Sequence, residues 1–389
     1  MDTRTTISTF TEFFRDRGHQ LIAGSSLVPP DGDQVMFTTA GMHPLTSYLA
    51  GEPHPLGPRL AGVQRCLRTT DLDEVGDDWH LTTFQMLGSW SLGDYGGPQS
   101  LHWGLELLCD GFGLRADRLH ATVFGGDEQS GPDTAALETW RELGLAVELT
   151  TGENWWSNGP TGPCGPDSEI FAWTGDGLPS GTPTTDDRWL ELWNHVTMRY
   201  QRRAGGRLVP LSRPSVDTGM GLERLMMVSH GARSVYETDV FFPWLSVLPG
   251  LWQPETRSLR IITDHLRSAI VVIGDGVRPA STGRGYVLRR LLRRALTELW
   301  RGDGTRTLAD LPEPLVAGTL SQFGQAGPPG VVQDVLLAEE RKFRRLLARG
   351  RSTLQRLYPD GQLSEHDYAY LHATHGLPRE LVTELASEL

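Results

Sequence analysis

The strongest constraint on the fold is a change in sequence texture near residue 258. Before it, short apolar runs typical of strands are separated by loops rich in glycine, proline and aspartate, such as residues 174–187. The clearest of these runs are Val35–Thr38, Ala121–Phe124 and Leu190–Tyr200. They lack the regular alternation of strands and helices that produces a parallel sheet. The sequence therefore predicts an α+β fold built on an antiparallel β-sheet flanked by helices.

Amphipathic helices are predicted at both ends of the chain. Near the N-terminus, residues 6–17 place apolar side chains on one stripe and end before Gly18, a typical C-terminal stop. The helices predicted after the change in texture are long, and they cover residues 261–274, 285–300 and 331–357. We expect two domains, a sheet domain over 1–250 and a helical domain over 251–389.

Composition supports a globular chain and excludes several classes of protein. Hydrophobic residues make up 38% and charged residues 22%, which excludes a disordered chain. No apolar run approaches the roughly 20 residues of a membrane span. The N-terminus does not resemble a signal peptide, so we expect a cytoplasmic protein with no membrane partner. Three scattered cysteines indicate neither a disulfide framework nor a zinc site.

Charge is informative in two ways. The net charge of −12 does not favour non-specific binding to nucleic acid. Lys342 is the only lysine of the chain. Any chemistry on anions near the N-terminal motifs must therefore depend on arginine, histidine and backbone N–H groups.

Several longer segments carry more information than composition. They are GSSLVPPD at 24–31, FTTAGM at 37–42, QRCLR at 64–68, WHLTTFQMLGSWSLGDY at 79–95, NWWSNGPTGPCGPDSEI at 154–170, WNHVTM at 193–198, VDTGMGLER at 216–224, DHLRS at 264–268 and GRGYVLRRLLRR at 283–294. In this order they resemble the catalytic core of alanyl-tRNA synthetase, a class II aminoacyl-tRNA synthetase, over nearly the whole chain. The resemblance implies a class II antiparallel sheet followed by a helical domain, with ATP and Mg²⁺ as cofactors.

Activation of an amino acid joins its carboxylate to the α-phosphorus of ATP and expels pyrophosphate, so fixed cations must stabilise the developing charge. The resemblance assigns Arg68 to the α-phosphate and the carboxylate, and Arg224 to the adenine and the γ-phosphate. It places Phe84 on the other face of the adenine, Met86 at the base edge and His80 near the phosphates. Outside these motifs, either arginine would more often form a surface ion pair, and the histidine would more often be a core residue.

The amino-acid pocket is the second part of the implied site. Asp217 is the candidate partner of the α-ammonium group, and Gly219 lets the backbone approach the ligand closely. A tryptophan and a valine around a methyl group would exclude larger side chains. Glycine and serine would be rejected only modestly, because one methylene is worth about 1–3 kcal/mol. The positions that match the lining of the family's alanine pocket are Met42, Trp156, Asn194 and Val196.

The chain departs from the family pattern at the nucleotide and tRNA positions. The family's lysine-bearing GGKHN insertion is absent after Arg68, HHTFFEM has become HLTTFQM at 80–86, and GDTG has become GPTG at 159–162. Ser281 and Ala373 replace the asparagine and aspartate that read the G·U pair of the tRNA acceptor stem, which removes most of that readout. A basic stripe is either a phosphate surface or a solvated helix face, and it comprises Arg289, Arg290, Arg293 and Arg294.

Three functions stay open. The first is activation of alanine, or a similarly small amino acid, with transfer to a small-molecule amine, a sulfonamide-like nucleophile or a carrier protein. The second is a minimal alanyl-tRNA synthetase, and the third is a nucleotide- or RNA-binding pseudoenzyme. The lost base-pair readers favour the first over the second, and the retained Arg68, Arg224 and Asp217 disfavour the third. Because the chain ends at Leu389, before the family's editing and dimerisation domains, we expect a monomer without editing.

Overall fold

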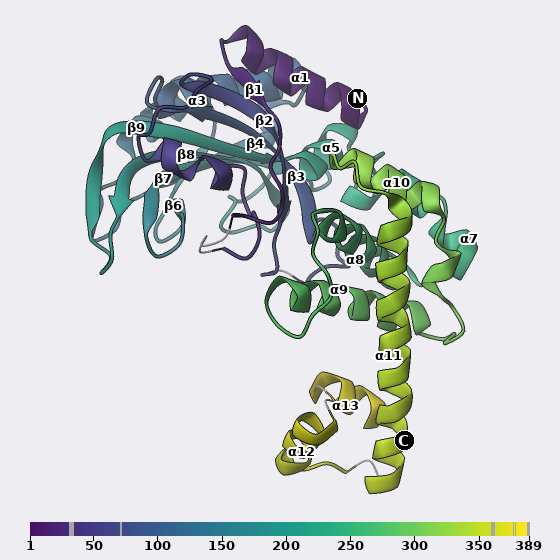
Figure 1. Ribbon diagram of the computed structural model, residues 1–389. Coiled ribbons are helices and arrows are strands. Elements are labelled where there is room, and N and C mark those ends of the chain that lie inside the picture. Colours follow the sequence, from purple (N-terminus) through teal and green to yellow (C-terminus); the bar gives the residue numbers. More distant parts are fainter. Residues whose placement is uncertain (31–34, 71, 359–361, 376, 378, 387–389) are drawn as a thin grey trace.

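The computed structural model describes the chain except residues 31–34, 71, 359–361, 376, 378 and 387–389 (Figure 1). The side chains of residues 372, 373, 375, 380, 381 and 384 also lie outside the description. Among the described residues, nine strands form one sheet in the order β1-β2-β3-β9-β8-β7-β4-β5, with β6 paired to β7. The strands are β1 Gln20–Ile22, β2 Arg59–Leu67, β3 Thr83–Ser91, β4 Leu119–Phe124, β5 Val147–Thr150, β6 Trp155–Ser157, β7 Gly162–Trp173, β8 Trp189–Arg202 and β9 Leu208–Gly221.

The sheet has the predicted antiparallel character. The pairs β2·β3, β3·β9, β8·β9 and β7·β8 at its centre are antiparallel, whereas β1·β2 and β4·β5 are parallel. The predicted strand residues Ala121–Phe124 lie in β4, and Leu190–Tyr200 lie in β8. The α+β fold class is therefore confirmed.

The strand predicted over Val35–Thr38 is wrong. The backbone of Thr38 pairs at single points with Leu27 and Leu67, at 2.9 Å each, but it joins no ladder. Phe37 is only 2% exposed and belongs to the largest hydrophobic cluster. Phe37 packs in the core although the run forms no ladder, whereas Met36 is exposed, and a short apolar run does not distinguish these cases from a buried strand.

The helices cover the sheet and build a second half beside it (Figure 1). Those before residue 255 are α1 Thr3–Asp16, α2 Thr46–Leu49, α3 Gly97–Glu106, α4 Thr134–Glu142, α5 Leu222–His230, α6 Phe242–Leu245 and α7 Leu248–Trp252. Those after it are α8 Thr256–Gly274, α9 Gly283–Trp300, α10 Glu313–Gln322, α11 Pro329–Leu357, α12 Glu365–His375 and α13 Arg379–Ala386. The long helices predicted from periodicity are α8, α9 and α11.

Helix α1 begins and ends as its sequence predicts. The Asp2 side chain accepts a hydrogen bond from the backbone N–H of Thr5 at 2.7 Å, which satisfies one of the free donors of the first turn. Phe10 and Phe14 are buried against the sheet. Gly18 has φ +81°, a left-handed conformation that glycine adopts without strain and that ends the helix.

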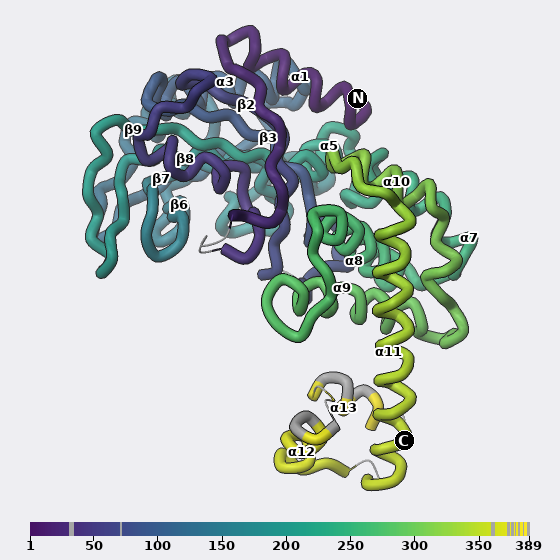
Figure 2. The backbone as a smooth tube through the Cα atoms, in the orientation of Figure 1, coloured from purple at the N-terminus to yellow at the C-terminus, as the bar shows by residue number. Residues whose placement is uncertain are grey.

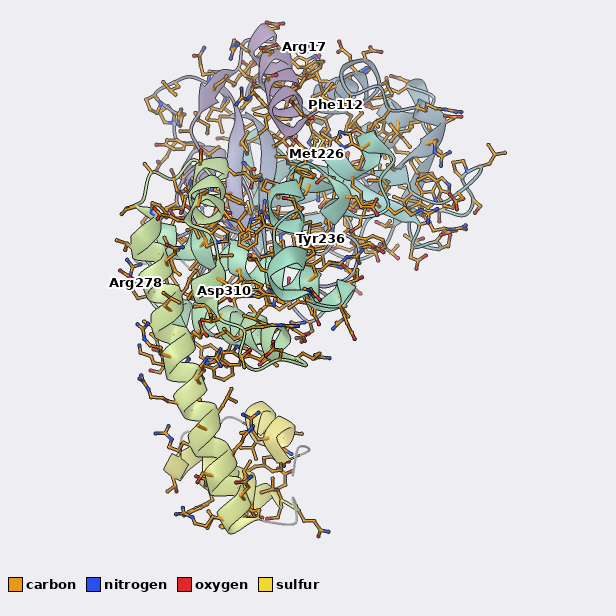
Figure 3. All side chains as sticks on the ribbon, turned by 90° about the vertical axis from the view of Figure 1, so that its right-hand side faces the viewer. Arg17, Phe112, Met226, Tyr236, Arg278 and Asp310 are labelled. Carbon is orange, nitrogen blue, oxygen red and sulfur yellow. The ribbon has the colours of Figure 1, made fainter. Side chains whose placement is uncertain are left out.

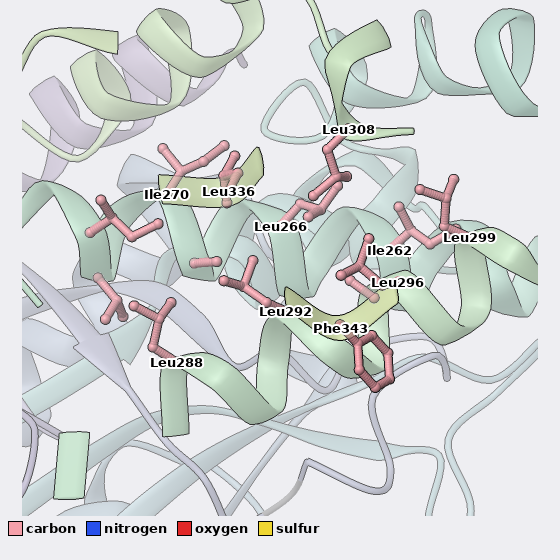
Figure 4. Packing of buried hydrophobic residues seen from close by; sticks show 14 of the residues in the cluster. Ile262, Leu266, Ile270, Leu288, Leu292, Leu296, Leu299, Leu308, Leu336 and Phe343 are labelled. Atoms are coloured by element: carbon pink, nitrogen blue, oxygen red, sulfur yellow. The ribbon is translucent and has the colours of Figure 1, made fainter. Parts of the chain in front are cut away.

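The helical half has its own hydrophobic core. Leucines recur every three or four residues along α9, which places them on one face toward α8 and α11. Figure 4 shows this packing, with Ile262, Leu266 and Ile270 from α8, Leu288, Leu292, Leu296 and Leu299 from α9, and Leu336 and Phe343 from α11. Helix α11 then runs away from the sheet to α12 and α13 (Figure 2), and charged side chains project along it (Figure 3).

The two halves share part of this core. Leu27, Phe37 and Leu67 of the sheet half belong to the same buried cluster as the helices α8 to α11. The domain boundary near residue 250 therefore stays a prediction. None of the described helices is both long and apolar enough to cross a membrane.

Candidate active site

A pocket opens on the sheet where β3, β8 and β9 meet the start of α5. Its empty volume is about 570 Å³, part of which is open solvent at the mouth of the pocket. All five residues that the sequence assigns to ATP line it, and so does Gly219 from the amino-acid set. The lining residues are Arg68, Trp79, His80, Leu81, Phe84, Met86, Glu191, Leu192, Gly219, Gly221, Glu223 and Arg224.

Arg68 lies immediately after β2 and is held on two sides. Its Nε donates to the carbonyl of Thr39 at 3.2 Å, and its guanidinium carbon lies 5.2 Å from the centre of the Phe84 ring. The backbone N–H of Arg68 donates to Thr82 at 2.9 Å, so the base of the side chain is fixed to the segment that leads into β3. The side chain therefore presents its remaining donors to the pocket beside an aromatic face.

Arg224 comes from the first turn of α5, which follows directly on β9. Its Nη1 donates to both the backbone carbonyl and the carboxylate of Glu191, at 3.1 Å each. The Arg224 side chain is 27% exposed, so it remains open to a ligand. A pocket with two guanidinium groups and one aromatic ring is suited to binding the phosphates and the base of a nucleoside triphosphate.

His80 lines the same pocket, but its ring is already engaged by the loop that precedes it. Nδ1 lies 2.5 Å from a carboxylate oxygen of Asp77, and Nε2 lies 3.1 Å from a carboxylate oxygen of Glu74. A phosphate would have to displace one of these carboxylates to reach the imidazole.

Four of the residues predicted to bind the amino-acid substrate lie on β8 and β9, and the strand register places them in two neighbouring cross-strand rows. In one row, Asp217 of β9 lies between Trp90 of β3 and Val196 of β8. In the next row, Gly219 lies opposite Asn194. Cross-strand neighbours share a face of the sheet, and so do residues two apart in one strand. These side chains therefore face the same side of the sheet.

An apolar cluster surrounds Asp217. It contains the predicted residues Met42, Val196 and Trp156 together with Met86 and Trp90. The cluster reaches the pocket at Met86, whose sulfur would lie only 2.6 Å from a Cβ placed on Gly219. Any side chain at residue 219 would displace that methionine.

The carboxyl group of Asp217 is almost completely buried from solvent. It is 7% exposed, and it accepts a 2.7 Å hydrogen bond from the Trp90 indole N–H. Burial raises the pKa of Asp217 to about 7, and the Trp90 hydrogen bond opposes part of that rise. A buried carboxylate with one donor is suited to receiving a cationic group.

Asn194 connects the site to Glu169, and Asp167 lies two residues before Glu169 in β7. The Nδ2 of Asn194 donates to Glu169 at 3.3 Å, and Glu169 lies opposite Asn194 in the register of β7 and β8. Burial raises the pKa of both Glu169 and Asp167, and the nearby Glu191 charge acts in the same direction. These acids hold protons more tightly than exposed carboxyl groups do.

The residues predicted to recognise an acceptor do not form a row of free cations. Arg293 donates to Glu339 at 3.0 Å and lies over Phe343. The side chains of Arg290 and Arg294 lie 3.7 and 3.3 Å from the carboxylate of Asp73.

The other residues predicted to recognise an acceptor are Arg289, Ser281 and Ala373. Arg289 lies over the Tyr286 ring. Ser281 is exposed in the turn before α9. The Ala373 side chain lies outside the described residues.

Sequence reasoning missed several residues of the site, and three of them form hydrogen bonds with predicted residues. Trp90 lies four residues after Met86 in β3. Since every second residue of a strand faces the same side of the sheet, alternation from Met86 was the signal that could have found it. Glu191 lies in the same predicted strand as Asn194, three residues before it, but nothing local distinguishes it from a surface acid. Glu169 lies within the motif at residues 154–170, but only the register between β7 and β8 places it opposite Asn194.

Comparison with known proteins places these features in a family. The family model described as tRNA synthetases class II (A) matches residues 6–389. The alanine–tRNA ligase of Treponema pallidum is 40% identical over 98% of this chain, and that of Rubrobacter xylanophilus is 38% identical over 97%. The chain spans 67% of the first relative's length and 46% of the second's.

A solved structure also matches at lower similarity. The apo histidyl-tRNA synthetase of Staphylococcus aureus is 12% identical, with a TM-score of 0.38, over 61% of this chain and 68% of that one. The match of the family model and the identity to the two alanine–tRNA ligases, by contrast, extend over almost all of the sequence. The chain therefore belongs to the class II (A) tRNA synthetases.

Proposed function

We propose that the chain activates alanine with ATP and transfers it to the 3′ end of a tRNA. The observation that carries the proposal is the continuity of the two predicted sites. Arg68, Phe84 and Arg224 line one pocket, and Met86 and Gly219 connect that pocket to the apolar cluster around Asp217. A triphosphate and a small amino acid would thus meet near Arg68.

The chemistry follows from these positions. Asp217 pairs with the α-ammonium group, and the Met42, Trp156 and Val196 side chains restrict the space for the methyl group. Arg68 draws the carboxylate and the α-phosphate together by neutralising both. The carboxylate oxygen then attacks the α-phosphorus, the bond to the β-phosphate oxygen breaks, and pyrophosphate leaves.

Mg²⁺ fits this pocket as a metal held together with ATP. Mg²⁺ commonly uses one or two protein carboxylates plus substrate phosphates, and Glu191 supplies a carboxylate in the lining. No cluster of three or more potential ligands occurs in the described part of the chain, so the phosphates would complete the coordination. The metal would neutralise phosphate charge, and Glu191 would hold it beside Arg224.

Alanine activation is expected to fall as the pH is lowered through about 7, the pKa of Asp217. The protonated carboxyl cannot pair with the ammonium group, whereas the carboxylate above that pH can. The measurement is kcat/KM for alanine in ATP–pyrophosphate exchange between pH 5.5 and 8.5. In Asp217→Asn, the residual rate should lose this inflection; an unchanged profile would show that another group titrates.

The same carboxyl predicts a pH effect on stability. Its pKa rises from 3.8 in the unfolded chain to about 7 in the fold, so the folded state binds this proton more tightly. Its contribution to the free energy of unfolding is therefore largest at low pH and is lost as the pH rises to about 7.

The similarity to alanine–tRNA ligases supports a tRNA acceptor over the non-tRNA acceptor that the sequence departures favoured. The departures affect two readers of one base pair, but the similarity extends over nearly the whole chain. A tRNA is therefore the better candidate for the acceptor, as in an alanyl-tRNA synthetase. A cytoplasmic location belongs to the same proposal.

One structural observation still favours a small-molecule or carrier-protein acceptor as a second candidate. Arg290, Arg293 and Arg294 contact carboxylates of the chain itself, at Asp73 and Glu339. Phosphates of a tRNA would have to compete with these carboxylates, which weakens the stripe as a nucleic-acid surface.

Charging of tRNA(Ala) is expected to proceed with little dependence on the G·U pair of the acceptor stem. A specific base contact discriminates by about 1–3 kcal/mol, and Ser281 cannot reproduce the paired hydrogen bonds of an asparagine. Changing G·U to G·C should therefore alter the rate of aminoacylation less than about tenfold. Ser281→Asn is the matched variant, and it should increase the preference for G·U.

A collapse of charging with the G·C variant would contradict this prediction. AMP release that depends on amines or a carrier-protein thiol, with no charging of either tRNA, would support the second candidate instead.

A further inference from the structure

Helix α8 buries a polar motif. Asp264, His265, Arg267 and Ser268 are all 0% exposed, although they lie in a helix whose other buried residues are largely apolar. Arg267 Nε and Ser268 Oγ have no hydrogen-bond partner within the described residues. A buried ion pair seldom stabilises a fold more than apolar packing of the same volume does. Stability alone therefore does not account for this motif.

The motif holds the segment that leads into β3. The Asp264 carboxylate accepts hydrogen bonds from the backbone N–H and the hydroxyl of Thr82, at 2.9 and 2.5 Å. One helical turn further, Arg267 donates from Nη1 to the carbonyl of Thr83 at 3.0 Å. Two consecutive residues just before Phe84 are thus tied to α8.

Arg267 also holds the start of α5. Its Nη2 donates to Glu223 at 3.2 Å, and its guanidinium lies between the rings of Phe241 and Phe323, at 4.7 and 4.6 Å. The two Glu223 carboxylate oxygens in turn accept from the backbone N–H of Gln85, at 3.2 and 3.1 Å. One guanidinium therefore connects the backbone on both sides of Phe84 to the residue next to Arg224.

We propose that Arg267 and Glu223 form a positioning pair that sets the spacing between Phe84 and Arg224 across the nucleotide pocket. The inference rests on the proposed function, because these two side chains are the ones assigned to the two faces of the adenine. Neither Arg267 nor Asp264 touches the pocket, so both act through other residues. The helical half thereby determines the geometry of the ATP site in the sheet half.

The charges of the pair depend on each other. Burial raises the pKa of Glu223, and the Arg267 guanidinium opposes that rise. Without the arginine, Glu223 would take up a proton more readily and would bind the Gln85 N–H less well. Loss of either partner should therefore loosen Phe84 and Arg224 together.

Arg267→Met tests the pair, because methionine keeps much of the volume and removes the charge. We expect the dissociation constant for ATP, measured by calorimetry on the full chain, and the KM for ATP to rise at least tenfold. The KM for alanine should change less than threefold. Arg65→Met is the matched control, since Arg65 forms a largely buried ion pair, at 2.9 Å, with Asp275 at the C-terminal end of α8. It should leave both ATP constants within threefold of the unmodified chain.

Equal effects of Arg267→Met and Arg65→Met on ATP binding would overturn the proposal, since they would indicate general loosening of the two halves. If Arg267→Met does not fold, Arg267→Lys decides. Lysine keeps the charge but cannot donate to Thr83 and Glu223 at the same time. A folded Arg267→Lys variant that binds ATP as tightly as the unmodified chain would therefore also overturn the proposal. ATP binding is measured without alanine, so this test stands even if the chain activates another amino acid.

Discussion

Replacing Arg68 or Arg224 with alanine is expected to slow alanyl-adenylate formation by roughly 10³-fold in each case, the size of effect seen when one preorganised donor is removed from a transition state. The cause is loss of a fixed cation beside the α-phosphate or the γ-phosphate. The measurement is ATP–pyrophosphate exchange with alanine. Arg115→Ala is the matched control, because that arginine is 69% exposed and pairs with Asp117 away from the pocket.

Lysine is not expected to rescue either position. Arg68 uses its Nε on Thr39 while its planar group lies beside Phe84, and an ammonium cannot do both. Rates within tenfold of the unmodified chain for both alanine variants would exclude the assignment and would favour a nucleotide-binding pseudoenzyme.

The second large effect is expected at Asp217. Asp217→Ala should reduce alanine activation by roughly 10²- to 10⁴-fold, because breaking a buried charge pair costs about 3–5 kcal/mol. It also removes the acceptor of the Trp90 indole N–H, which lies 2.7 Å away. The measurement is kcat/KM for alanine, together with the dissociation constant for ATP, which should be unchanged.

Asp217→Asn separates charge from structure. Its amide oxygen can still accept from Trp90, so the local fold should be kept while the negative charge is lost. We therefore expect the same loss of alanine activation with less loss of thermal stability than in Asp217→Ala. Activity of Asp217→Asn within tenfold of the unmodified chain would refute the role in ammonium binding.

Much of the fold could be predicted from local patterns. The spacing of Phe10 and Phe14 followed by Gly18 predicts α1 and its end, because helix periodicity and a glycine stop are encoded in adjacent residues. Motif resemblance likewise identified Arg68 and Arg224, whose side chains line the same pocket. The strand prediction at Val35–Thr38 was wrong, because a short apolar run can indicate a buried side chain such as Phe37 but not whether the backbone pairs with a strand.

Partners that are distant in sequence could not be predicted in this way. From the sequence alone, the arginines of α9 are either a phosphate surface or a solvated helix face, and no local pattern identifies a partner for Arg267 of α8. In the structure, however, Arg267 is fully buried against Glu223, and Arg293 is paired with Glu339. A carboxylate 44 or 46 residues away is invisible to a local pattern, and its presence decides whether an arginine faces water, a ligand or the core.

The sequence by itself thus determined the fold class, the order of the motifs and the chemical identity of the site residues, since these depend on residue type and local spacing. Only the tertiary structure decided that Trp90 and Val196 lie on either side of Asp217, that Glu169 reaches Asn194, and that α8 holds the entry to β3. Those contacts arise from the register between strands and from packing between helices. Both are settled by the burial of whole surfaces rather than by any one segment.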